Sequence, residues 1–146
     1  MVAGTQPVPG DLPGGADAEL QLLALLAIVD RGCELQPRAE AVLRACATVT
    51  HPGPALAREG GYVAGEYHRL HGWAADADRA PPADALYRHV ALLMLQHCML
   101  VHHAVRLAFP KTAHRPARCP IAPELGDPAR LLRDSRDELA RRVGDA

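Results

Sequence analysis

Apolar residues recur at helical spacing along most of the chain, and the pattern predicts five helices. The expected helices cover residues 17–31, 37–50, 55–76 and 84–109, with a last one that follows Asp127 and includes Val143. Gly32 suits the position just after the first helix, and Pro37 suits the first turn of the second. Asp84 and Asp127 are the expected N-caps of the fourth and fifth helices, with Pro128 as the first helical residue of the fifth.

The predicted helices differ in how much apolar surface they carry. Residues 17–31 are apolar nearly all round, which predicts burial on two sides, between neighbouring helices or in a subunit interface. Residues 55–76 contain four glycines, each costing about 1 kcal/mol relative to alanine in a helix interior. The helix over 84–109 is expected to be the longest and the central one.

Composition supports helices over strands. The chain has 27 alanines and 20 leucines against 16 β-branched residues. We therefore expect an all-α protein, an antiparallel four- or five-helix bundle with a long central helix and a proline-rich loop (110–127) before the C-terminal helix. At 146 residues, a single domain over 16–146 is expected after a Pro/Gly-rich flexible tail over 1–15.

The net charge and the cysteine pattern indicate which partners and which cell compartment to expect. A net charge of −1 argues against nucleic-acid or membrane binding as a default. The N-terminal segment lacks the basic start of a signal peptide, and the stretch Val90–Val101 looks too short and too polar to cross a bilayer. Four cysteines without a CxxC pair favour a cytoplasmic protein. Lys111 is the only lysine, a bias typical of the GC-rich coding of many bacteria.

The chain carries no nucleophile elbow and no phosphate-binding glycine loop, so no catalytic residue is assigned. Ser135 is the only serine, and it lies in a charged helix without a nearby histidine. Cys33 is the one cysteine expected to be exposed. These features favour a protein that is not an enzyme.

Eight histidines are the one enriched chemical feature, and helical geometry divides them. At about 100° per residue, His97 lies on the apolar side of the helix over 84–109 and should be buried. Such a histidine either bonds a backbone carbonyl or a tyrosine hydroxyl, from Tyr67 or Tyr62, or serves as a metal ligand or general base.

The metal alternative combines His97 with residues of the preceding helix. His71 would be the second ligand and Glu66 or Asp84 the carboxylate, with His68 one turn before His71. A divalent transition metal with an open water position is the cofactor that such a site implies.

A second metal hypothesis uses soft ligands on one flank of the helix over 84–109. Met94, Cys98 and His102 follow one another at intervals of four, and together they could hold Cu(I) or Zn(II). Met and Cys on an apolar face are, however, far more often packing residues.

The opposite side of that helix carries a polar stripe. Its members are Arg88, His89, Gln96, His103 and Arg106. The stripe could face water, a partner chain including a second copy, or a small anion held by the two arginines. We therefore expect an interaction or accessory protein that self-associates through residues 17–31 or 84–109. One alternative is an enzyme with its site between the helices over 55–76 and 84–109. The other alternative is a sensor of a small anionic ligand.

Overall fold

The computed structural model describes residues 14–110 and 121–145, which form four α-helices. They are α1 (Gly14–Thr48), α2 (Pro54–Arg79), α3 (Ala85–Ala108) and α4 (Asp127–Gly144). The described ranges contain no strand, which confirms the all-α prediction. Most of the predicted N-terminal tail and of the proline-rich loop, including His114 and Cys119, lies outside the described residues.

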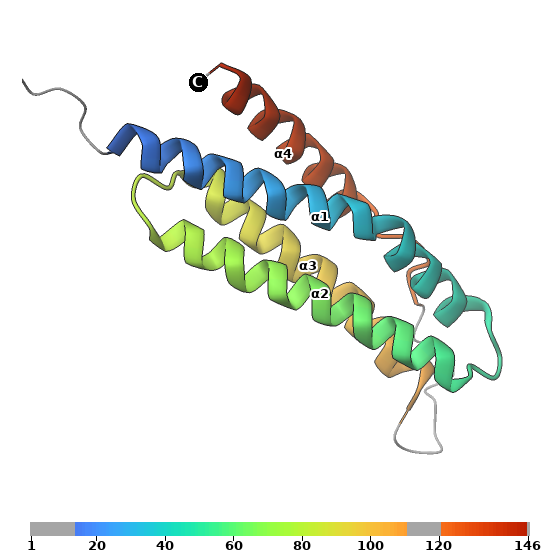
Figure 1. Cartoon of the computed structure of the whole chain (residues 1–146). Coiled ribbons are helices and arrows are strands. Elements are labelled where there is room, and N and C mark those ends of the chain that lie inside the picture. The colour runs from blue at the N-terminus through green and yellow to red at the C-terminus, as the bar shows by residue number, and fades with distance from the viewer. Residues whose placement is uncertain (1–13, 111–120, 146) are drawn as a thin grey trace, which may run out of the picture.

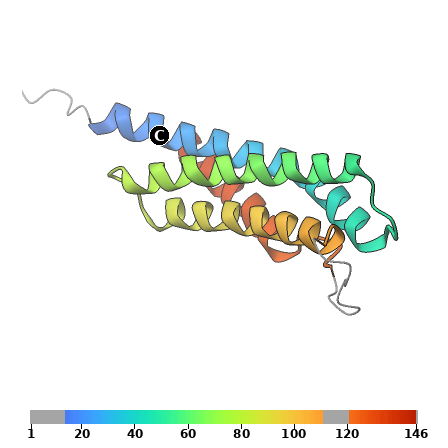
Figure 2. The same ribbon diagram turned by 90° about the horizontal axis from the view of Figure 1, so that it is seen from below.

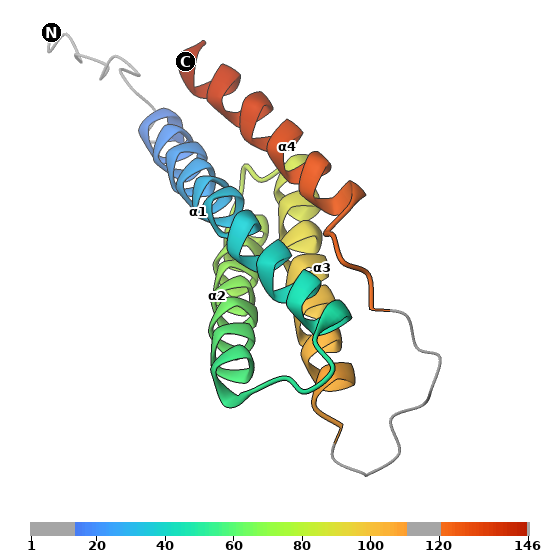
Figure 3. The same ribbon diagram turned by 90° about the vertical axis from the view of Figure 1, so that its right-hand side faces the viewer.

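The helices form a bundle in which consecutive helices run in opposite directions (Figure 1). α2 and α3 lie side by side, and α1 packs along both of them (Figure 2). α4 covers α1 and α3 and, within the described residues, makes no contact with α2 (Figure 3). As a result, α1 and α3 each contact all three other helices.

The separate helices expected over 17–31 and 37–50 are one continuous helix, α1, so that prediction is wrong. With 35 residues α1 is also longer than α3, which has 24. Pro37 lies inside α1 and cannot donate a backbone hydrogen bond to Cys33, a defect that usually bends a helix. The helix continues because Leu35 and Ala39, on either side of the proline, are buried against the rest of the bundle.

Gly32 remains helical because the bundle uses its lack of a side chain. A Cβ atom at this position would lie 2.5 Å from Cε of Met94 and 3.1 Å from Cδ2 of Leu132. A larger residue here would force the Met94 and Leu132 side chains to move, so the glycine permits the close packing of α1 on α3 and α4. The glycine that looked like a helix end is a packing site.

α2 forms over the whole predicted range and slightly beyond it, despite its glycines. Val63, Tyr67, Leu70 and Ala74 recur at helical spacing and form an apolar stripe that is buried. Gly60 allows close packing, because a Cβ there would lie 2.4 Å from Cγ2 of Val105. Gly61, Gly65 and Gly72, in contrast, face open space.

The predicted N-cap of α3 is confirmed and that of α4 is wrong. The Asp84 side chain accepts a hydrogen bond from the Leu86 amide at 2.9 Å, as predicted for an N-cap. α4 begins at Asp127 rather than after it, and its N-cap is Gly126 with φ of 69°, a conformation that favours glycine. Arg142 of α4 reaches back to the Asp84 carboxylate at 2.6 Å and joins the two helices.

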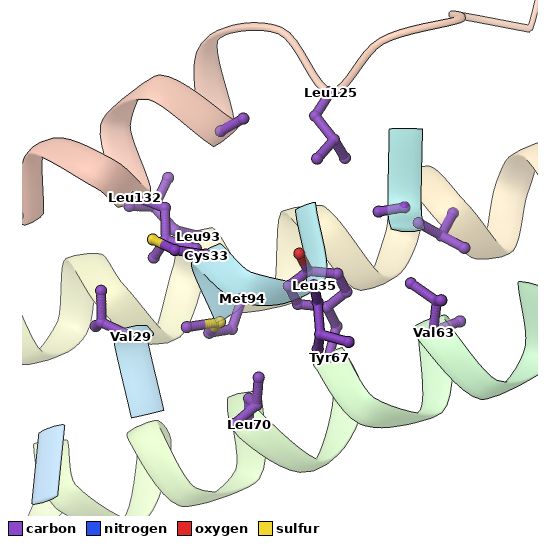
Figure 4. Close-up of a cluster of buried hydrophobic side chains, with 14 of the residues drawn as sticks. Val29, Cys33, Leu35, Val63, Tyr67, Leu70, Leu93, Met94, Leu125 and Leu132 are labelled. Carbon is purple, nitrogen blue, oxygen red and sulfur yellow. The ribbon is translucent and has the colours of Figure 1, made fainter. Parts of the chain in front are cut away.

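The core lies where the four helices meet (Figure 4). Leu93 and Met94 of α3 lie there beside Leu132 of α4 and Tyr67 of α2 (Figure 4). Leu125, from the described end of the loop before α4, is 2% exposed and joins the same core. Leu125 is therefore buried although its neighbours Glu124 and Gly126 are exposed.

α3 is long and apolar enough by length and composition to cross a membrane, which the shorter stretch Val90–Val101 did not suggest. The core helix of a soluble bundle has the same properties, and α3 contacts the three other helices. The finding is compatible with a soluble protein.

Candidate functional site

The side of α3 that faces away from the bundle is the candidate interaction surface. We call it the outer stripe and define it as His89, Leu92, Gln96, Met99, His103 and Arg106. All six are exposed, and the apolar members Leu92 and Met99 are 52% and 60% exposed. Residues on the opposite side, such as Met94 and Val101, are fully buried. The core packing of α3 therefore leaves this stripe facing outwards.

The stripe follows alternating intervals of three and four residues, which is the spacing of a coiled-coil seam. Leu95 and Leu100 lie beside it and are only half-buried. A hollow of about 410 Å³ adjoins the stripe where α4 begins, lined by Gln96, Met99, Leu100, His103 and Pro128. The surface thus combines a helical ridge with an apolar hollow, as helix-docking surfaces do.

The two arginines that the sequence placed with this stripe are far apart. Arg88 and Arg106 are separated by eighteen positions on one helix, or about 27 Å at a rise of about 1.5 Å per residue. They cannot hold one small anion together. Arg88 instead lies 3.7 Å from the Asp78 carboxylate of α2.

His97 is completely buried, as predicted, and both of its ring nitrogens have partners. Nδ1 lies 2.6 Å from the Leu93 carbonyl oxygen, so it must carry the proton and donate. Nε2 then accepts from the Gln36 side-chain amide at 3.2 Å. Burial lowers the pKa of His97, so the ring is neutral.

Gln36 extends this arrangement from α3 through α1 to α4. Its amide also donates to the Ala129 carbonyl oxygen at 3.1 Å, and its side-chain oxygen accepts from Arg133 at 3.0 Å. The Tyr67 ring packs against His97 at 4.9 Å between centroids. Its hydroxyl donates to the Gly32 carbonyl oxygen at 2.7 Å, so Tyr67 contacts His97 by packing only. His97 is thus a satisfied core histidine.

The residues of the first metal hypothesis have separate partners. His71 Nδ1 bonds the Ala91 carbonyl oxygen at 2.9 Å, which fixes α2 against α3. Glu66 lies 3.0 Å from Arg69 and 3.7 Å from Arg31, and His68 is exposed. Within the described residues, no three His, Cys, Asp or Glu side chains come together in a way that could hold a metal ion.

The soft-ligand residues also diverge. Met94 is fully buried against Gly32 in the core. Cys98 and His102 line a groove of about 420 Å³ between α2 and α3, together with His68. Burial raises the pKa of the Cys98 thiol, so it is a poor thiolate ligand at neutral pH.

Cys33, expected to be exposed, is buried on α1. Burial raises the pKa of its thiol, which disfavours a role as a nucleophile.

Sequence reasoning missed Gln36 and Arg133, the partners that hold His97. Gln36 precedes a proline and was placed in a break between helices, where no side chain is expected to be buried. The available signal was its place one turn after Gly32 and one residue after Leu35, on a helix that contacts three others.

Comparison with protein-family models, with curated proteins and with solved structures finds no match for this chain.

Proposed function

We propose that this chain is a non-enzymatic interaction module of the cytoplasm that works as a homodimer through the outer stripe of α3. The observation that carries the proposal is the exposure of Leu92 and Met99 in a seam of coiled-coil spacing. Two large apolar side chains lie on a face that the chain's own helices leave uncovered. A partner helix would remove them from water.

The apolar surface of the stripe supports a weak interface. Burying one such side chain fully contributes about 1.5–3 kcal/mol relative to leaving it exposed. Since both residues are about half exposed, two copies together would gain several kcal/mol from the four side chains, before the entropy cost of association. These four side chains alone therefore correspond to a weak dimer with a dissociation constant in the millimolar range.

Sedimentation equilibrium over micromolar to millimolar concentration tests this proposal. Leu92→Ser with Met99→Ser should turn a dimer into a monomer while leaving the helical circular dichroism unchanged. The matched control is Leu20→Ser with Leu23→Ser on α1, two leucines that are 64% and 42% exposed. This control removes as much exposed apolar surface from the other helix that could mediate self-association.

The control pair should remain dimeric. Dissociation by the α1 substitutions rather than by the α3 substitutions would move the interface to α1. A wild-type chain that stays monomeric at the highest concentration would overturn the proposal altogether.

A further inference from the structure

We propose that two copies of this chain pair their α3 helices antiparallel, with His89, Leu92 and Gln96 of one copy facing Arg106, His103 and Met99 of the other. This inference rests on the homodimer proposed above and adds its geometry. In an antiparallel pair about a twofold axis, residues equally far from the middle of the seam face each other. The middle of the outer stripe lies between His97 and Cys98, which fixes this register.

The charges along the stripe distinguish the two possible directions. α3 contains no acidic residue between Ala85 and Ala108, and its outer stripe ends in Arg106. A parallel pair would place Arg106 beside the partner's Arg106. Like charges held together in this way destabilise an interface.

An antiparallel pair brings Arg106 to the other end of the partner's α3, where a carboxylate is available. Asp78 of α2 lies there, 3.7 Å from Arg88, with its side chain 23% exposed. Among the residues that the structure describes, Arg106 makes no ion pair within its own chain. Arg106 of each copy can therefore share the Asp78 carboxylate of the other copy with Arg88.

The pairing of side chains in each layer is compatible with this direction. Leu92 of one copy packs on His103 of the other, and Met99 packs on Gln96. The rings and aliphatic parts of these polar residues can cover the apolar side chains while their polar atoms reach the edge of the seam. Gln96 near the centre would help to fix the register, as single polar residues do in coiled coils.

Disulfide trapping between two differently tagged chains tests the direction. One chain carries Leu92→Cys and the other His103→Cys, both at exposed positions where folding should be unaffected. In the antiparallel register these two cysteines meet. Two copies of the same variant would hold their new cysteines about 16 Å apart, eleven residues along the helix, which is too far for a disulfide.

The expected result is a cross-linked heterodimer in the mixture and no added cross-link in either variant alone, above the background of the wild-type cysteines. Cross-linking of each variant with itself would indicate a parallel pair and overturn the inference. A dimer by sedimentation that gives no cross-link in the mixture would also overturn it, but would leave the homodimer intact.

Two further outcomes would overturn this inference together with the proposed function. A monomeric wild-type chain overturns both. A monomer that binds phosphatidylglycerol vesicles, and loses that binding with Leu92→Ser and Met99→Ser, would assign the stripe to a membrane surface instead.

The ion pair provides an independent measurement of the same geometry. Asp78→Asn and Arg106→Gln should each weaken the dimer by about two- to fivefold, the range for partly exposed pairs. Within one chain Asp78 of α2 lies beside Arg88 at the N-terminal end of α3, whereas Arg106 lies near the C-terminal end of α3, so the two residues can interact only across the interface. Equal effects of Arg106→Gln in the wild-type and the Asp78→Asn background would show that no such pair forms.

Discussion

Replacing Gln36 with leucine removes the side chain that links α1, α3 and α4 in the core. Leucine has a similar volume, so the substitution changes hydrogen bonding more than packing. It deletes the donor to His97 Nε2 at 3.2 Å, the donor to the Ala129 carbonyl oxygen at 3.1 Å and the acceptor of Arg133 at 3.0 Å.

The free-energy cost comes mainly from His97. The ring is 0% exposed, so Nε2 is left as a buried acceptor without a donor, which costs about 1–3 kcal/mol. Arg133 is exposed and can donate to water instead, so the loss of its hydrogen bond to Gln36 adds little to the cost. With the lost bond to Ala129, we expect a decrease in the unfolding free energy of about 2–3 kcal/mol. The melting temperature should fall by roughly 6–12 °C for a chain of this size.

A double-mutant cycle separates hydrogen bonding from packing. Urea unfolding followed by circular dichroism is measured for the wild type, Gln36→Leu, His97→Leu and the double variant. Since removing both partners leaves no orphaned acceptor, the double variant should be more stable than the sum of the single effects by about 1 kcal/mol or more. Additive effects, or a Gln36→Leu protein as stable as the wild type, would refute this account of the core.

Three further predictions use the same unfolding measurements. In the folded chain burial lowers the pKa of His97, whereas in the unfolded chain the ring takes up a proton near its ordinary pKa, so the unfolding free energy should fall as the pH drops below about 6.5. His97→Gln should reduce this dependence of the unfolding free energy on pH. The same pH dependence in the wild type and the variant would contradict the prediction. Gly61→Ala should stabilise α2 by up to about 1 kcal/mol, whereas Gly60→Ala should destabilise it because of Val105; the same sign for both would exclude the described packing. Asp84→Ala should cost about 0.5–2 kcal/mol through the lost cap, and an unchanged midpoint would argue against that cap.

The local signals that proved reliable were those in which a residue acts on its own helix. Asp84 caps α3 as its side-chain chemistry predicts, and the apolar stripe of α2 faces the core. The same reasoning placed His97 inside the bundle and Gln96 outside it. The cap follows from the acceptor chemistry of one side chain, and the inward and outward faces follow from the helical period of 3.6 residues, a property of the backbone.

The signals that misled were those in which a local preference competes with packing. Gly32 and Pro37 favour a helix end and a helix start, yet α1 runs through both. The preference of each residue is about 1–3 kcal/mol, and burial of Leu35, Ala39 and their neighbours against three helices outweighs it. A single sequence does not show where such neighbours lie.

The sequence by itself determined the helical class, most helix boundaries and which side of α3 is buried, because these depend on residues a few positions apart. Only the tertiary structure decided what each histidine contacts. His97 is held by Gln36, 61 positions away, and His71 by Ala91, 20 positions away. Such partners meet through the packing angle and register of whole helices, which depend on all the contacts of the core at once. Those contacts engage His71 and His97 in interhelical hydrogen bonds and leave the outer stripe exposed.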